Sequence, residues 1–124
     1  MLFTVSVHDV KGVYAVYFNL EKEKTVECGG LGAINFPPGT YIYVGSAMNS
    51  LESRIHRHFN SQENKHWHID YFSEAAKPES VFFVFTEDSS LECTLAEYFS
   101  SALEEVDGFG SSDCGCNSHL FRKL

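Results

Sequence analysis

The sequence has 124 residues, of which 44% are apolar and 15% aromatic, and its 17 acidic and 9 basic side chains give a formal net charge of −8. A chain of this size buries roughly 65% of its unfolded surface, which excludes disorder and predicts a single domain over residues 1–124. The acidic balance excludes a protein that coats DNA without regard to sequence, so we expect any contact with nucleic acid to be local.

The sequence lacks the signals of secretion and of membrane insertion. No apolar run approaches the roughly 18 residues that a membrane span requires, so we expect no membrane partner. Residues 1–5 contain no basic segment of the kind that begins a signal peptide. We therefore expect a cytoplasmic protein whose four cysteines are reduced.

The first half of the chain predicts a three-stranded antiparallel unit. Residues 12–20 are rich in β-forming side chains, and a charged run after them marks a turn. Residues 25–28 would then complete a hairpin with the first strand. After a glycine-rich segment and a Pro-Pro-Gly break, residues 41–44 resume extended structure as the third strand.

The second half predicts helices around one strand. Leu51, Ile55 and Phe59 recur at helical spacing behind a capping residue, Asn49 or Ser50. The other predicted elements are a helix at residues 65–76, where a strand fits about as well, a buried strand at residues 80–86, a helix from Asp88 or Ser89 to about Val106, and a loop from Asp107 onward. Together they predict an α+β fold, a small antiparallel or mixed β-sheet flanked by helices.

Two tripeptides carry the strongest functional signal. Gly-Val-Tyr at residues 12–14 opens the first strand, and Tyr-Val-Gly at residues 43–45 closes the third. Arg54 follows on the first helix, with His58 one helical turn beyond it. In this order they resemble the GIY-YIG nuclease superfamily, in which two such tripeptides lie on adjacent strands and an arginine follows on the first helix.

Further segments extend the resemblance over nearly the whole chain. They lie at residues 41–47, 54–58, 66–71, 92–93, 108–116 and 118–121. The ordered set is similar to the Uri-type endonucleases, the branch called domain of unknown function 123, which is sometimes fused to endonuclease III. Typical superfamily members separate the tripeptides by about ten residues, whereas 28 residues lie between Tyr14 and Tyr43 here, enough for the extra strand.

The resemblance implies a GIY-YIG-like fold and a metal-dependent endonuclease that hydrolyses phosphodiester bonds in DNA, with RNA as a less favoured substrate. Tyr43 would be the general base and Tyr14 would position the attacking water. Arg54 would offset the charge that grows on the scissile phosphate, and His58 would contact the phosphate or assist the leaving oxygen. The alternatives are a non-catalytic nucleic-acid-binding module or a zinc-stabilised interaction module on the same scaffold.

A carboxylate is needed to hold Mg²⁺ or Mn²⁺, and the last predicted helix offers Glu92 and Glu97. The apolar stripe of this helix comprises Leu91, Leu95, Phe99, Ala102 and Val106. Glu92 lies within about 60° of that stripe, whereas Glu97 falls on the opposite side. The acidic pattern of the superfamily would instead favour Glu97. We choose Glu92 as the metal ligand on geometry, although an acid in a first helical turn also suits the helix dipole.

Two further sets of residues could bind ligands. Cys114, Cys116 and His119, with Cys93 as a possible fourth, are zinc-ligand types and otherwise small buried side chains. His66, His68 and Asp70 are also ligand types, although their spacing is not that of a typical site. The predicted nucleic-acid-binding residues are Gly45, Ser46, Arg57, Lys65, His66, Trp67 and His68. Binding should therefore be confined to one face and should weaken steeply with salt.

Overall fold

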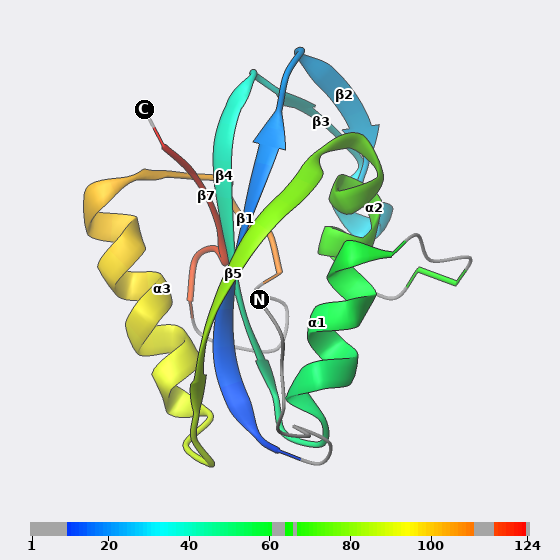
Figure 1. The fold of residues 1–124 in the computed structure, drawn as a ribbon. Coiled ribbons are helices and arrows are strands. Elements are labelled where there is room, and N and C mark those ends of the chain that lie inside the picture. Colours follow the sequence, from blue (N-terminus) through cyan, green and yellow to red (C-terminus); the bar gives the residue numbers. More distant parts are fainter. Residues whose placement is uncertain (1–9, 61–63, 66, 111–115, 124) are drawn as a thin grey trace.

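The computed structural model describes residues 10–60, 64–65, 67–110 and 116–123. Its centre is a five-stranded antiparallel sheet with the strand order β5-β1-β4-β7-β6 (Figure 1). The strands are β1 (Gly12–Leu20), β4 (Gly39–Ala47), β5 (Lys77–Phe85), β6 (Glu104–Glu105) and β7 (Leu120–Lys123). The helices are α1 (Leu51–Phe59), α2 (His68–Ala75) and α3 (Ser90–Ala102). The predicted α+β fold is confirmed.

Helices cover both faces of the sheet, with α1 and α2 on one side and α3 on the other (Figure 1). Tyr14 and Phe18 of β1 point into the larger core beneath α1 and α2, whereas Val44 and Phe121 pack against α3. A strand buried on both faces needs apolar residues at every position rather than at alternate ones. This explains why β1 is apolar along nearly its whole length.

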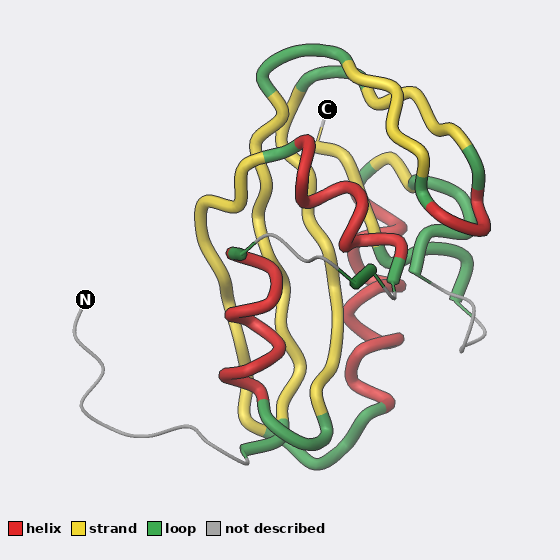
Figure 2. Tube along the Cα trace, turned by 90° about the vertical axis from the view of Figure 1, so that its right-hand side faces the viewer, coloured by secondary structure: helices red, strands yellow, loops and turns green. Residues whose placement is uncertain are grey.

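The predicted hairpin between residues 12–20 and residues 25–28 is wrong. β1 pairs directly with β4, and β2 (Lys24–Glu27) pairs with β3 (Ala33–Phe36) in a separate two-stranded sheet. A 3₁₀ turn at Gly29–Leu31 reverses the chain between them, with Gly32 at a φ of 74° that favours glycine. Figure 2 shows this hairpin at the top of the molecule, outside the five-stranded sheet.

The helix predictions at α1 and α2 are confirmed, and Ser50 caps α1 by accepting a hydrogen bond from the Ser53 amide. The third helix is shorter than predicted. It ends at Ala102 because Leu103 adopts extended backbone and the chain then enters β6. Of the predicted apolar stripe, Leu95 and Phe99 pack around the buried Ala96.

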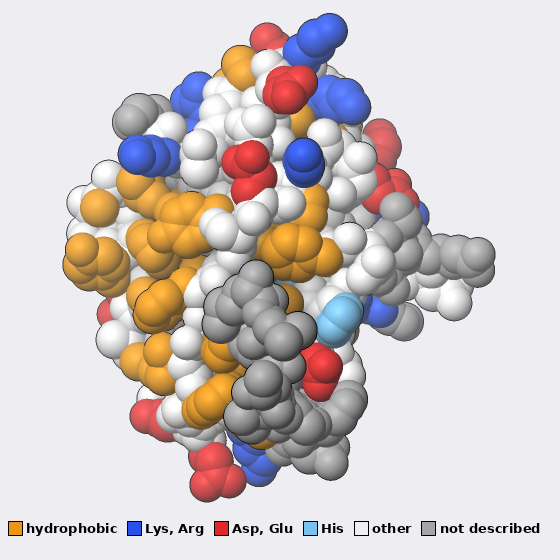
Figure 3. All heavy atoms as spheres, viewed as in Figure 1, with side chains coloured by type: hydrophobic (Ala, Val, Ile, Leu, Met, Phe, Trp, Pro, Cys, Tyr) orange, Lys and Arg blue, Asp and Glu red, His pale blue; other side chains and the backbone are white. Residues whose placement is uncertain are grey.

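Two predictions about strands need correction. The strand predicted as buried at residues 80–86 is β5, which begins earlier, at Lys77, and forms one edge of the sheet. Its Phe82 is 57% exposed, and hydrophobic side chains gather on the surface over β5 and α3 (Figure 3). The predicted C-terminal loop contains β7, which lies between β4 and β6. A strand of four residues is too short for an alternation of apolar and polar residues to identify it in the sequence. It is recognised instead by its pairing with β4 and β6.

Within the part of the chain that the structure describes, no helix has both the length and the apolar composition to cross a membrane.

Candidate active site

The two tripeptides lie directly opposite each other on neighbouring antiparallel strands. In the β1–β4 register Tyr14 faces Gly45, and Val16 faces Tyr43. The glycine is required by this packing, because a Cβ on Gly45 would lie 2.5 Å from the Tyr14 hydroxyl oxygen. The tyrosine ring therefore crosses the strand at a position that has no side chain.

The edge of β4 opens next to these tripeptides. β7 pairs with β4 only as far as Tyr43, and beyond it the Val44 amide donates to the His119 carbonyl oxygen at 2.9 Å. No strand within the described residues pairs with Gly45 and Ser46 on that side. Side chains from both faces of the sheet can therefore meet around this edge.

A cavity of about 220 Å³ occupies this position. Its lining consists of Tyr43, Gly45, Ser46, Arg54, Trp67, Glu92, Gly110 and His119. The lining residues come from β4, α1, α3, the residue before α2 and the segment that leads into β7. The structure thus brings together three of the predicted catalytic residues, Tyr43, Arg54 and Glu92, with the predicted binding residues Gly45, Ser46 and Trp67.

Glu92 is held by hydrogen bonds to both of its carboxylate oxygens. The Ser46 hydroxyl donates to Oε1 at 2.6 Å, and His119 Nδ1 lies 2.9 Å from Oε2. Burial alone would raise the pKa of Glu92, but the bonds from His119 and Ser46, together with the charge of Arg54, outweigh burial and lower it below 4.5. Glu92 is therefore ionised at neutral pH. Glu97 is exposed and does not line the cavity.

Arg54 is positioned by contacts on two sides. Its Nη1 donates to the Ser46 carbonyl oxygen at 2.9 Å, and its guanidinium lies 4.4 Å from the centre of the Trp67 ring. Arg57 lies 4.8 Å from the same ring and forms a 2.8 Å ion pair with the buried Asp70. Asp70 also accepts the Trp67 amide at 3.1 Å. Both arginines thus contact the Trp67 ring, and Arg54 also lines the cavity.

Tyr14 and His58 lie behind the cavity rather than in its wall. The Tyr14 hydroxyl and His58 Nε2 are joined by a 2.6 Å hydrogen bond, and the His58 ring lies 5.5 Å from that of Tyr43. Burial lowers the pKa of His58 to about 4 and raises the pKa of Tyr14 well above 10. His58 is therefore neutral at pH 7. With 2% exposure and no place in the lining, it is not brought to where a phosphate would bind, contrary to its predicted contact.

The other predicted nucleic-acid-binding residues that the structure describes, Arg57, Lys65 and His68, do not line the cavity. Lys65 pairs with Glu74 at 2.7 Å. His68 Nδ1 accepts the Gly110 amide at 2.9 Å, and burial lowers the pKa of His68 below 6.5. His66 lies outside the described residues. His68 therefore supports a wall of the cavity through Gly110 instead of lining it.

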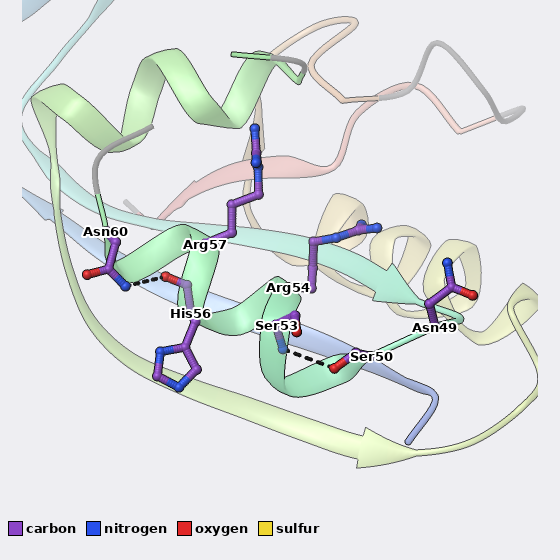
Figure 4. A pocket seen from close by; sticks show the side chains of 7 residues that line it. All are labelled: Asn49, Ser50, Ser53, Arg54, His56, Arg57 and Asn60. Atoms are coloured by element: carbon purple, nitrogen blue, oxygen red, sulfur yellow. Dashed lines mark hydrogen bonds between the residues drawn. The ribbon is translucent and has the colours of Figure 1, made fainter. Parts of the chain in front are cut away.

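A second, more open groove of about 600 Å³ runs along α1 (Figure 4). The described residues that line it are Asn49, Ser50, Ser53, Arg54, His56, Arg57 and Asn60, none of which carries a carboxylate. Figure 4 shows these side chains on α1 and at its two ends, with Arg54, His56 and Arg57 extending from the helix in different directions. Arg54 lines both this groove and the cavity, so the two hollows adjoin at one guanidinium.

Cysteine and histidine side chains gather beside Glu92. One ligand atom from each of Cys93, Cys116 and His119 lies within 4.8 Å of the others, and such a group could bind a metal ion. The structure therefore places together three of the four residues predicted as zinc ligands. The fourth, Cys114, lies outside the described residues.

Sequence reasoning missed two parts of the cavity. Gly110 has a φ of 70°, and a Cβ there would lie 3.2 Å from the Tyr43 ring and 3.4 Å from the His119 Cβ. His119 was predicted only as a zinc ligand, yet it contacts Glu92. The glycine in Gly-Phe-Gly was a usable signal for Gly110, because a positive φ favours that residue. Nothing in the spacing of residues 92 and 119 indicates that they meet.

The comparisons with known proteins give one family. Its model, described as Domain of unknown function DUF123, matches residues 13–124. The match contains every residue that lines the cavity. No curated protein and no solved structure matches the chain.

Proposed function

The chain belongs to the family described as Domain of unknown function DUF123, and we propose that it is a metal-dependent endonuclease that hydrolyses phosphodiester bonds in DNA. The observation that carries the proposal is that Tyr43, Arg54 and Glu92 line one cavity. The resemblance of the tripeptides to those of the GIY-YIG nucleases supports the same activity. RNA is the alternative substrate, because the roles proposed for Tyr43, Arg54 and Glu92 concern the phosphate, which DNA and RNA share, and not the sugar.

The lining residues supply three parts of a hydrolysis, namely a base at Tyr43, a cation for the phosphate at Arg54 and a metal ligand at Glu92. Tyr43 acts as the base in its phenolate form, after its hydroxyl proton has passed to solvent, and the phenolate oxygen accepts a proton from the attacking water and returns to a hydroxyl. The buried pair of Tyr14 and His58 packs behind the Tyr43 ring. The Arg54 guanidinium donates to the phosphate oxygens, where negative charge grows in the transition state. The cavity of about 220 Å³ holds a phosphate group and several waters, since one water occupies roughly 30 Å³.

The Glu92 carboxylate fits a hard divalent cation. Each of its oxygens accepts one hydrogen bond and retains a lone pair, and the Ser46 hydroxyl offers a further oxygen beside it. Mg²⁺ commonly binds one or two carboxylates together with water and substrate phosphate, and Mn²⁺ accepts the same ligands. When bound, the cation would stabilise negative charge on the phosphate.

Nicking of plasmid and branched DNA in Mg²⁺ or Mn²⁺ tests the proposal. We expect Tyr43→Phe, Arg54→Ala and Glu92→Gln each to lower the cleavage rate by about 100-fold or more. Glu97→Gln is the matched control for Glu92→Gln, because Glu97 is exposed on the same helix, and it should cleave at the wild-type rate. Cleavage that survives all three changes in the cavity would refute the mechanism.

A second candidate function is a zinc-stabilised nucleic-acid-binding module without cleavage. The observation that favours it is the cluster of Cys93, Cys116 and His119, since two thiolates and an imidazole suit Zn²⁺ better than Mg²⁺. This candidate predicts about one zinc ion per chain in the purified protein, together with DNA binding that no divalent cation converts into cleavage. Cleavage that Glu92→Gln abolishes would exclude it.

A further inference from the structure

We propose that a metal ion bound by Cys93, Cys116 and His119 fixes the Glu92 carboxylate, so that filling this cluster tightens the binding of Mg²⁺ or Mn²⁺ in the cavity. The inference rests on the proposed function for the placement of the hard cation at Glu92. It adds a second metal site and an energetic coupling between the two sites. His119 is the positioning residue, because it belongs to the cluster and also contacts Glu92.

The hydrogen bonds of His119 decide which of its nitrogens can bind the metal. Nδ1 lies 3.0 Å from the Val44 carbonyl oxygen and 2.9 Å from Glu92 Oε2. Both partners are acceptors, so Nδ1 carries the proton, and the lone pair of the neutral ring is on Nε2. A ligating histidine whose other N–H donates to a carboxylate or a carbonyl is the usual arrangement in metal sites.

The His119 ring is held from several directions. Its backbone amide donates to the Phe109 carbonyl oxygen at 2.8 Å, and its carbonyl accepts the Val44 amide at 2.9 Å. The residue is 1% exposed, and a Cβ added to Gly110 would lie 3.4 Å from the His119 Cβ. The imidazole is therefore a fixed ligand, and the cysteines must move to complete a metal site.

The cluster is slightly too wide for a bound zinc ion. With Zn–S bonds of about 2.3 Å, tetrahedral geometry puts the ligand atoms about 3.8 Å apart, whereas the cluster spans up to 4.8 Å. Cys93 directly follows Glu92 in the first turn of α3. Movement of Cys93 toward the metal therefore draws the backbone of Glu92 toward His119, which is a second route by which the metal holds the carboxylate.

The net charge of the cluster does not change when the metal binds. Two thiols lose their protons as a divalent ion enters, so the charge of the ion is balanced by the two thiolates. The coupling therefore arises from orientation and from a stronger Nδ1–H donor rather than from repulsion of the second cation. Loss of such an outer contact commonly weakens metal binding by about 10- to 100-fold.

Two cations with different ligand preferences report the two sites separately. Under reducing conditions, Co²⁺ added to metal-free protein should give a thiolate-to-metal absorption band that saturates at about one ion per chain. Binding of Mn²⁺, followed by the electron paramagnetic resonance of the free ion, should be about tenfold tighter with the cluster filled by Zn²⁺ than with it empty. Linkage requires Mn²⁺ to tighten Zn²⁺ binding by the same factor.

Three variants separate coordination from folding. Cys116→Ser should lose the cobalt band and the gain in Mn²⁺ affinity, whereas Cys28→Ser, a buried cysteine outside the cluster, should keep both. His119→Asn retains a side-chain N–H for Glu92 but no imidazole lone pair, so it should bind Mn²⁺ as zinc-free wild type does. Circular dichroism checks that each variant is folded.

The possible failures of the two proposals can be told apart. Absence of the cobalt band in wild type, or an equal Mn²⁺ affinity with and without Zn²⁺, would overturn the coupling even if the protein cleaves DNA. A disulfide between Cys93 and Cys116 that persists in reductant would overturn it as well. Zinc-dependent Mn²⁺ binding in a protein that cuts neither DNA nor RNA would support the coupling and refute the endonuclease.

Discussion

His58 is buried behind the cavity, where desolvation lowers its pKa from 6.5 to about 4 and the nearby charges of Arg54 and Arg57 act in the same direction against Asp70. The unfolded chain binds this proton near pH 6.5, whereas the folded protein binds it only near pH 4. Acid therefore favours the unfolded state, and stability falls as the pH drops through this interval.

The resulting prediction is a loss of about 2 kcal/mol of unfolding free energy between pH 7 and pH 5 that is due to His58 alone. Urea denaturation at several pH values should show this loss in wild type and a correspondingly weaker pH dependence in His58→Gln. His56→Gln is the matched control, because His56 is exposed on the same helix and should keep the wild-type dependence. Parallel curves for wild type and His58→Gln would contradict the burial argument.

At the scale of elements, the packing of β1 against β4 depends on a glycine opposite a tyrosine. Gly45→Ala should cost about 1–3 kcal/mol, because the new Cβ would overlap the Tyr14 hydroxyl oxygen at 2.5 Å and displace it from His58. Chemical denaturation measures the loss. Gly30→Ala is the control, since no atom lies within 4 Å of the Cβ it would add and it should leave stability almost unchanged.

The elements that the sequence predicts correctly have local causes. The helix α1 follows from the Ser50 cap and from apolar residues at helical spacing, whereas α2 was predicted from a segment that a strand fits about as well. The β2–β3 hairpin and β7 were missed because pairing between short strands depends on the partner rather than on the segment itself. Strand β5 was expected to be buried because it is apolar, although it lies at an edge of the sheet.

In the candidate site, too, the predictions from motifs and helix geometry hold better than those that depend on packing between distant segments. The resemblance to a nuclease family predicted that Tyr43 and Arg54 would lie close together, and helix geometry selected Glu92 over Glu97 for the same cavity. His58 was expected beside the phosphate because it is one turn from Arg54, yet its ring enters the core. Helical spacing identifies which side chains are neighbours on one helix. It does not show which of them are buried, because burial depends on the side chains of the sheet that pack against the helix.

At the scale of the whole molecule, an aromatic cluster joins the sheet, α2 and the β2–β3 hairpin. The Phe72 ring lies 4.8 Å from Phe36, 5.0 Å from Tyr41, 5.4 Å from Phe18 and 6.3 Å from Phe109. Contacts of this kind add to the burial of each ring. The cluster therefore links the β2–β3 hairpin to the five-stranded sheet and α2.

Phe72→Ala should lower the unfolding free energy by about 3–5 kcal/mol, because it opens a cavity at the centre of this cluster. Urea denaturation monitored by circular dichroism measures the change. Phe82→Ala removes the same side chain from an exposed position on β5, where 57% of the residue is already in water, and should cost far less. Equal losses for the two variants would mean that the cluster is not the main core.

The distribution of the cavity residues along the chain also has a consequence for biosynthesis. A ribosome completes Tyr43, Arg54 and Glu92 well before it reaches His119 and the strand β7 that pairs with β4. A nascent chain stalled before residue 116 would therefore carry the predicted base, arginine and carboxylate without the wall that gathers them. We therefore expect any activity of this cavity to begin only once the segment through Lys123 has left the exit tunnel and β7 has paired with β4.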